Sequence, residues 1–233
     1  MSSPTVINLH AAPTGYDALK EEAARYALLR RIAPAMRHHM AGSMQPISMI
    51  AAILERRLQA PEPDLAVLRD SGKSISTLAR SAASAAMNLI TWVVPNENGV
   101  MPLAAGIEEC LGMLSTDLAF RGFNVTNKVV AAELNVSVFS LRTVFTASLI
   151  ALTDAALAPA SIVISSEPAG EQTRVCIKLT SEDGAALPEQ AGSFRQLSWD
   201  DVQALAAAEQ VSVRHSASHA DMLFNEVLLA ATV

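Results

Sequence analysis

Apolar residues follow a helical period through residues 16–58. They recur at steps of three and four, which places them on one face of a long helix: Leu28, Ile32, Met36, Met40, Met44, Ile47, Ile50, Leu54 and Leu58. Pro34 and Pro46 lie inside this pattern. Because each proline removes a backbone donor and crowds the preceding turn, we expect a kink near each one.

A second helical pattern begins after a short turn. Residues 60–64 contain two prolines that end the first helix, and Asp64 is placed to cap the next one. The apolar and small residues that follow keep alternating steps of three and four: Leu65, Leu68, Gly72, Ile75, Ala79, Ala82, Ala86, Leu89 and Val93. The two helices predict a hairpin. One hairpin leaves apolar surface exposed, so we expect a homodimer in which two hairpins form a four-helix bundle.

Turn-forming residues then separate the hairpin from a region of mixed pattern. That region has helical patterns at 103–121, 138–157 and 199–210, and strand patterns at 123–129, 161–166, 173–180, 211–215 and 222–230. Helices that alternate with a mostly antiparallel sheet predict an α+β fold, with an α/β sandwich after the hairpin. The expected division is a disordered leader at 1–15, the hairpin at 16–94, a linker at 95–100 and a second domain at 101–233.

Composition removes several function classes. The formal net charge is −6, and Lys and Arg are scattered along the 233 residues, so no basic stripe for a nucleic acid is present. No stretch reaches the roughly 18 apolar residues that a membrane span needs. Cys110 and Cys176 are far apart and lack CxxC spacing, so the sequence indicates neither a metal site nor a redox pair. We therefore expect a cytoplasmic protein that binds neither nucleic acid nor membrane.

The segment 36–47 carries the most informative chemistry. If Met36 marks the centre of the buried face, His38 points about 200° away, toward solvent, and His39 lies near the edge of that face. An exposed imidazole on a rigid helix can act as a nucleophile toward a phosphoryl group on another protein. The alternative is that both histidines are ordinary solvated polar residues.

These residues resemble a known motif. The Arg37-His38 pair, the Met44-Gln45 pair and Ile47 are similar to the phosphoacceptor box of two-component histidine kinases and dimeric histidine phosphotransferases. The resemblance implies that His38 is the phosphorylated residue. The family usually has Asp or Glu next, as a base that orients the ring, whereas this chain has His39, which becomes the candidate orienter.

The element order of the second domain resembles the ATP-binding domain of these kinases, of the GHKL type. Asp154 lies in the helix where the family has an asparagine-rich magnesium site. Glu182 and Gly184 lie in the segment EDGAALP, which resembles the adenine-recognition loop, although Ala186 replaces its second glycine. A glycine-rich phosphate loop has no counterpart between 188 and 201. We expect these residues to be vestigial, ATP binding to be lost and no cofactor to be bound.

Three functions fit this pattern. The first is a phosphorelay protein that accepts a phosphoryl group on His38 from a response-regulator receiver and passes it to another, with the receiver supplying magnesium. The second is a pseudokinase scaffold that binds a response regulator without chemistry. The third is a soluble histidine kinase, which requires ATP affinity.

Overall fold

The computed structural model describes residues 15–94, 99–130, 134–186 and 195–227. The expected leader at 1–15 lies almost wholly outside the described residues, as do most of the linker at 95–100 and the end of the strand expected at 222–230. Within the described part, the α+β class expected from the sequence is confirmed. None of the described helices combines the length and the apolar character needed to cross a bilayer.

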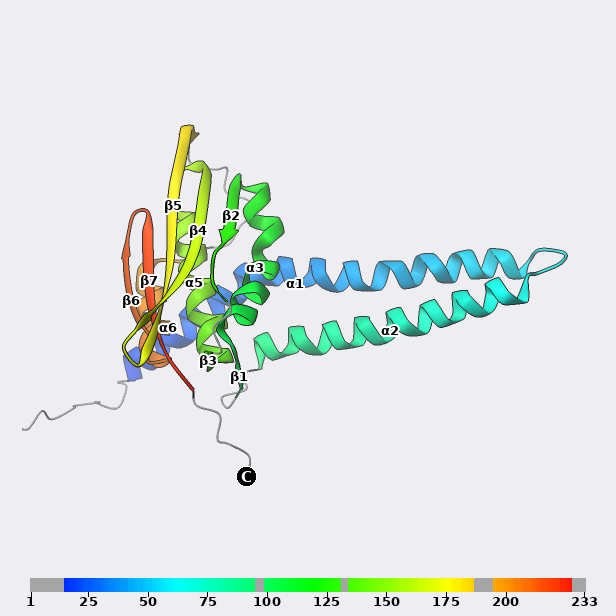
Figure 1. The fold of residues 1–233 in the computed structure, drawn as a ribbon, viewed down its shortest axis with the longest axis horizontal. Coiled ribbons are helices and arrows are strands. Elements are labelled where there is room, and N and C mark those ends of the chain that lie inside the picture. Colours follow the sequence, from blue (N-terminus) through cyan, green and yellow to red (C-terminus); the bar gives the residue numbers. More distant parts are fainter. Residues whose placement is uncertain (1–14, 95–98, 131–133, 187–194, 228–233) are drawn as a thin grey trace, which may run out of the picture.

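The hairpin consists of α1 (Gly15–Leu58) and α2 (Leu65–Val93). It projects from the rest of the molecule as two antiparallel helices (Figure 1). Asp64 caps α2 as expected, because its side chain accepts hydrogen bonds from the backbone N–H groups of Ala66 at 2.9 Å and Val67 at 3.3 Å. α1 continues as one helix through both of its prolines.

The second part of the chain is built on a five-stranded sheet. Its strands are β2 (Phe123–Asn127), β4 (Ala158–Ala169), β5 (Gln172–Ala186), β6 (Ser212–Ser216) and β7 (His219–Asn225). They lie in the order β2-β4-β5-β7-β6, with β2 parallel to β4 and the other neighbours antiparallel. A separate antiparallel pair is formed by β1 (Val100–Pro102) and β3 (Asn135–Ser137).

Helices cover one face of this sheet (Figure 1). They are α3 (Leu103–Phe120), α6 (Trp199–Ala208) and a composite helix made of α4 (Val138–Ser140), the π-helical turn Leu141–Phe145 and α5 (Thr146–Asp154). Alternate side chains on the central strands are buried against them: Ala160, Ile162, Ile164, Val175, Ile177, Leu179, Ala220, Met222 and Phe224. The opposite face of the sheet carries the intervening, mostly polar residues.

The beginning of α1 packs with this second part of the chain. Ala24, Leu28 and Ile32 are buried in the same core as the sheet residues, and α1 contacts both α6 and α3. Arg25 of α1 also forms an ion pair with Glu209 at 2.7 Å. α1 is therefore shared: its first part completes the α/β core, and its later part forms the hairpin with α2.

Candidate phosphoacceptor site

His38 lies where α1 leaves the α/β core. Its side chain is exposed, and within the described residues no hydrogen bond to its ring is formed. Its ring contact is with His39, at 6.4 Å between ring centroids and 76° between ring planes. The His38 ring nitrogens therefore face solvent.

The residues one helical turn from His38 carry no long side chain. On a helix, the neighbours of His38 on the same face are Pro34, Ala35, Ala41 and Gly42; Ala35 is partly buried, and the other three are exposed. No heavy atom of the structure lies within 4 Å of the position that a Cβ of Gly42 would take. Another protein could therefore approach the His38 ring closely. Arg37, which is also exposed, adds a positive charge beside the ring.

His39 holds α1 against α3. Its Nε2 lies 3.2 Å from the carbonyl oxygen of Gly112. Because a carbonyl can only accept, the imidazole must carry its proton on Nε2 and donate it. The hydrogen bond that His39 makes thus goes to α3 rather than to His38.

Asp154, at the end of α5, is held by two arginines. Arg31 of α1 binds both carboxylate oxygens, with Nη2 at 2.8 Å from Oδ1, and Arg121 places its Nη2 at 3.1 Å from Oδ1. The backbone N–H of Leu197 donates to Oδ2 at 3.3 Å. The Asp154 side chain is only 5% exposed. Its oxygens are therefore fully engaged by protein donors.

Glu182 and Gly184 lie near the end of β5 and are exposed. Glu182 accepts a hydrogen bond from the Ser161 hydroxyl on β4 at 3.3 Å. Gly184 has a φ of 82°, a conformation that glycine adopts without strain. Among the described residues, no hydrogen bond or ion pair links Glu182 or Gly184 to Asp154.

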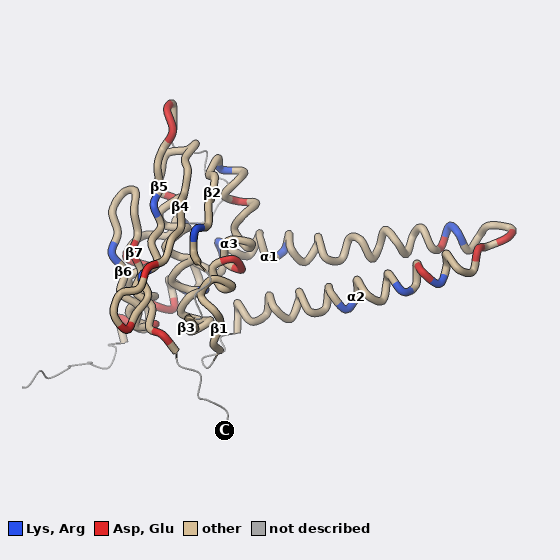
Figure 2. Tube along the Cα trace, viewed as in Figure 1, with Lys and Arg blue, Asp and Glu red and all other residues tan. Residues whose placement is uncertain are grey.

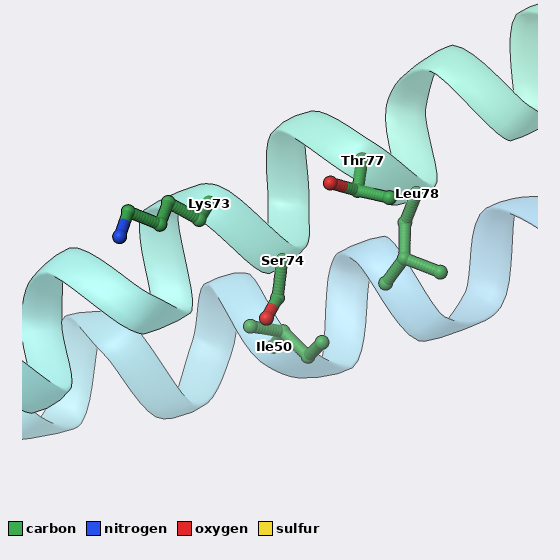
Figure 3. Close-up of a pocket in the computed structure, with 5 residues that line it drawn as sticks. All are labelled: Ile50, Lys73, Ser74, Thr77 and Leu78. Carbon is green, nitrogen blue, oxygen red and sulfur yellow. The ribbon is translucent and has the colours of Figure 1, made fainter.

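Two of the cavities formed by described residues lie away from these residues. One is an open groove between α1 and α2, with a volume of about 390 Å³. In Figure 3, Ser74 and Leu78 of α2 point toward Ile50 of α1 across this groove, whereas Lys73 extends away. The other, of about 250 Å³, lies between α1, the end of α2 and the π-helical turn, and Trp92 and Arg142 line it. Neither is lined by His38, Asp154, Glu182 or Gly184.

Arg142 connects the end of α2 to the α/β core. Its guanidinium donates to Thr91 at 2.7 Å and to Glu109 at 2.6 Å, and it lies over the Trp92 ring at 5.1 Å. The Trp92 indole N–H donates to the same Glu109 carboxylate at 3.0 Å. Both ends of the hairpin are thus fixed to the core, α2 through Arg142 and α1 through Arg31.

Sequence reasoning did not identify these anchoring contacts. Arg31 and Asp154 are 123 positions apart, and His39 and Gly112 are 73 apart. A local pattern can show that a residue is polar in a buried segment, but it cannot show which distant residue it meets.

Comparisons with known proteins give fold-level similarities only. No protein-family model and no curated protein matches the chain. Among solved structures, the histidine kinase AdeS of Acinetobacter baumannii is 17% identical over 77% of this chain and 96% of that chain, with a TM-score of 0.42. A histidine kinase from Burkholderia phymatum STM815 is 12% identical over 91% and 98%, with a TM-score of 0.41. A bacterial phosphotransferase is 12% identical over 92% and 100%, with a TM-score of 0.40.

Proposed function

We propose that this chain is a phosphorelay protein that accepts a phosphoryl group on His38 from a receiver-domain aspartate and passes it to a second receiver. The observation that carries the proposal is the setting of His38. Its side chain is exposed on a helix that Arg31 and His39 fix to the α/β core, and its neighbours one helical turn away carry short side chains. A rigid, accessible nucleophile is what a transfer between two proteins requires.

The transfer needs few groups from this chain. A neutral ring nitrogen of His38 supplies the electron pair for the new N–P bond, the P–O bond to the receiver aspartate breaks, and its electrons remain on the released carboxylate. The receiver supplies the magnesium ion that stabilises the charge on the transferred group. The second transfer is the same reaction in reverse, onto the carboxylate of another receiver.

The contacts of Asp154 favour this relay over the soluble kinase. A kinase site needs carboxylate or amide oxygens that are free to hold magnesium and the nucleotide phosphates. Both oxygens of Asp154 are taken by Arg31 and Arg121, and Glu182 is hydrogen-bonded to Ser161. A phosphoryl group that arrives on a receiver does not need this site.

The relay is proposed to act as a homodimer. Residues 38–54 of α1 and 81–94 of α2 contain no Asp, Glu, Lys or Arg. Figure 2 shows that the acidic and basic residues of the hairpin gather toward its tip. The uncharged part exposes large apolar side chains: Met40, Met44, Met49, Ile53, Met87, Ile90, Val93 and Val94. A second hairpin would cover such a surface in a four-helix bundle.

The pseudokinase scaffold is the second candidate, and one observation favours it. His39 directs its Nε2–H to Gly112, so the described residues offer His38 no side chain that orients its ring. A scaffold would bind a receiver with equal affinity whether or not His38 is present.

Both candidates can be separated in one experiment. Receivers are loaded with radiolabelled phosphate and mixed with the wild-type chain, with His38→Ala or with His39→Ala. A parallel reaction contains ATP labelled on its γ-phosphate, with magnesium, in place of the receiver. The relay predicts label on the wild type and on His39→Ala but none on His38→Ala. Label from ATP alone would indicate a kinase. Receiver binding that is equal in all variants, without label on any, would indicate the scaffold.

A further inference from the structure

Three metal-ligating side chains meet on the face of the sheet opposite the helices. Cys176 on β5 is paired directly with Asp221 on β7, and His219 lies two residues before Asp221 on the same face. The Cys176 Sγ is 3.7 Å from the His219 Nε2, which in turn is 2.8 Å from the Asp221 Oδ2. All three ligand atoms lie within 4.8 Å of one another.

The geometry differs from that of a catalytic Cys-His-Asp relay. In such a relay the thiol and the carboxylate contact different nitrogens of the imidazole, because a proton must pass across the ring. Here Sγ and Oδ2 both approach the same nitrogen, Nε2. Three donor atoms that converge on one point are arranged for a shared cation rather than for proton transfer.

The distances suit a tetrahedral divalent ion. Zn²⁺ binds sulfur at about 2.3 Å and nitrogen or oxygen at about 2.0–2.2 Å, so its ligand atoms lie roughly 3.3–3.7 Å apart. The Cys176–His219 separation already falls at this value, and the His219–Asp221 pair needs to open by only about 0.5 Å. The donors come from two hydrogen-bonded strands, which hold their backbones in register.

The cluster lies among charges of both signs. In the sheet register, Arg214 on β6 is paired with Asp221, and Lys178 on β5 is paired with His219. Among the described residues, however, the ion pair that Asp221 forms is with His219. Arg174, on the same strand as Cys176, is paired with Glu167 at 2.7 Å. A bound metal ion would displace the thiol proton and neutralise the Asp221 charge.

We propose that Cys176, His219 and Asp221 form a binding site for a divalent cation of the Zn²⁺ class, with a fourth coordination position open to solvent. Mixed sulfur, nitrogen and oxygen ligands favour Zn²⁺ or Co²⁺ over Mg²⁺ or Ca²⁺, which prefer oxygen alone. The site lies on the sheet face opposite the covering helices, whereas His38 is on α1, which packs against α3 and α6 on the other side, so the site is independent of the proposed phosphotransfer.

Cobalt titration of the full chain, with any purification tag removed, tests the proposal. A Co²⁺–thiolate bond gives a charge-transfer band in the near ultraviolet, and Zn²⁺ should displace the Co²⁺ and abolish that band. We expect one equivalent per chain, no band in Cys176→Ser, and affinities at least about tenfold weaker in His219→Gln and Asp221→Asn. Circular dichroism of each variant before titration checks that it is folded.

The other cysteine provides a matched control. Cys110 is fully buried, and burial raises the pKa of its thiol to about 12, so Cys110→Ser should keep the band unchanged. His38→Ala should also keep it. A wild-type chain without a thiolate band would overturn the proposal. So would a band that persists in Cys176→Ser or disappears in His38→Ala.

Discussion

His39 donates a hydrogen bond from Nε2 to the carbonyl oxygen of Gly112 at 3.2 Å, and so joins the hairpin helix α1 to α3 of the α/β core. Its neighbour His38 points to solvent. The two adjacent histidines thus have different environments: one is fixed to the protein, and the other is available to a partner. This division allows the role of each to be tested separately.

Loss of the His39 contact should weaken the protein and slow transfer without abolishing it. His39→Ala removes one hydrogen bond, which is worth about 0.5–1.5 kcal/mol of the free energy of unfolding. His39→Gln keeps a side-chain donor and should recover part of both losses. Urea denaturation and transfer rates measure the two effects. Complete loss of transfer in His39→Ala, equal to that of His38→Ala, would show that His39 takes part in the reaction itself.

The Asp154 ion pairs should dominate the stability of the junction between α1 and the core. Asp154→Ala leaves the Arg31 and Arg121 guanidiniums, which are 16% and 9% exposed, without their shared carboxylate. Breaking a buried pair from one side costs roughly 3–5 kcal/mol. Urea denaturation followed by circular dichroism gives the free energy of unfolding.

Asp117→Ala is the matched control for that measurement. Asp117 also pairs with Arg121, at 3.4 Å, but its side chain is 45% exposed. Its removal should cost less than about 1 kcal/mol, since exposed pairs contribute little. Equal losses in the two variants would show that burial of Asp154 does not govern the effect.

Charged substitutions in the uncharged part of the hairpin should weaken the dimer. Ile90 and Met87 of α2 are 51% and 62% exposed. An aspartate at either position would be buried unpaired between two hairpins, so the dissociation constant should rise at least about tenfold. Light scattering over a concentration series measures it. Phe120→Asp, on α3 outside the hairpin, is the control and should leave the dimer intact; an effect as large as that of Ile90→Asp would place the interface elsewhere.

Asp201 should make stability depend on pH in the acid range. Burial alone would raise its pKa, but hydrogen bonds from the Arg195 guanidinium and from Ser198 outweigh burial and hold the pKa below the ordinary 3.8. Because the folded-state pKa is lowered, the stabilisation is complete above the unfolded-state value and is lost as pH falls through the lowered pKa. Asp201→Asn should therefore be less stable than wild type near about pH 7, with a difference that shrinks toward about pH 3.

Asp200→Asn serves as the comparison for Asp201. Asp200 is exposed in the same first turn of α6 but does not contact Arg195. Urea denaturation at both pH values should show a smaller and flatter effect for Asp200→Asn. A constant difference between Asp201→Asn and wild type across the range would contradict the lowered pKa.

Local patterns predicted the elements, because the period of apolar residues is a property of neighbouring positions. The hairpin, the Asp64 cap and the order along the chain of the helices and of the strands in the five-stranded sheet follow from it, whereas the short pair β1–β3 was not predicted. The strand expected from residue 222 begins instead at His219, since His219 and Asp221 are polar residues on the outer face and continue the alternation without adding apolar positions.

Contacts between distant positions could not be predicted in the same way. The packing of the first part of α1 into the α/β core depends on partners more than a hundred residues away, such as Asp154 for Arg31. Cys176 and His219 meet only because β5 pairs with β7 in one register. Sequence spacing showed Cys176 as an isolated cysteine, whereas the sheet gives it two neighbours that can bind a metal ion.

The most direct test of His38 as the phosphoacceptor is to locate the phosphoryl group after incubation with a phosphorylated receiver. Peptide mapping by mass spectrometry under neutral to alkaline conditions preserves phosphohistidine, which acid hydrolyses. The relay predicts an acid-labile phosphoryl group on the peptide containing His38, on the His38 ring and not on His39. A phosphoryl group on another residue, or none on a chain that still binds the receiver, would contradict it.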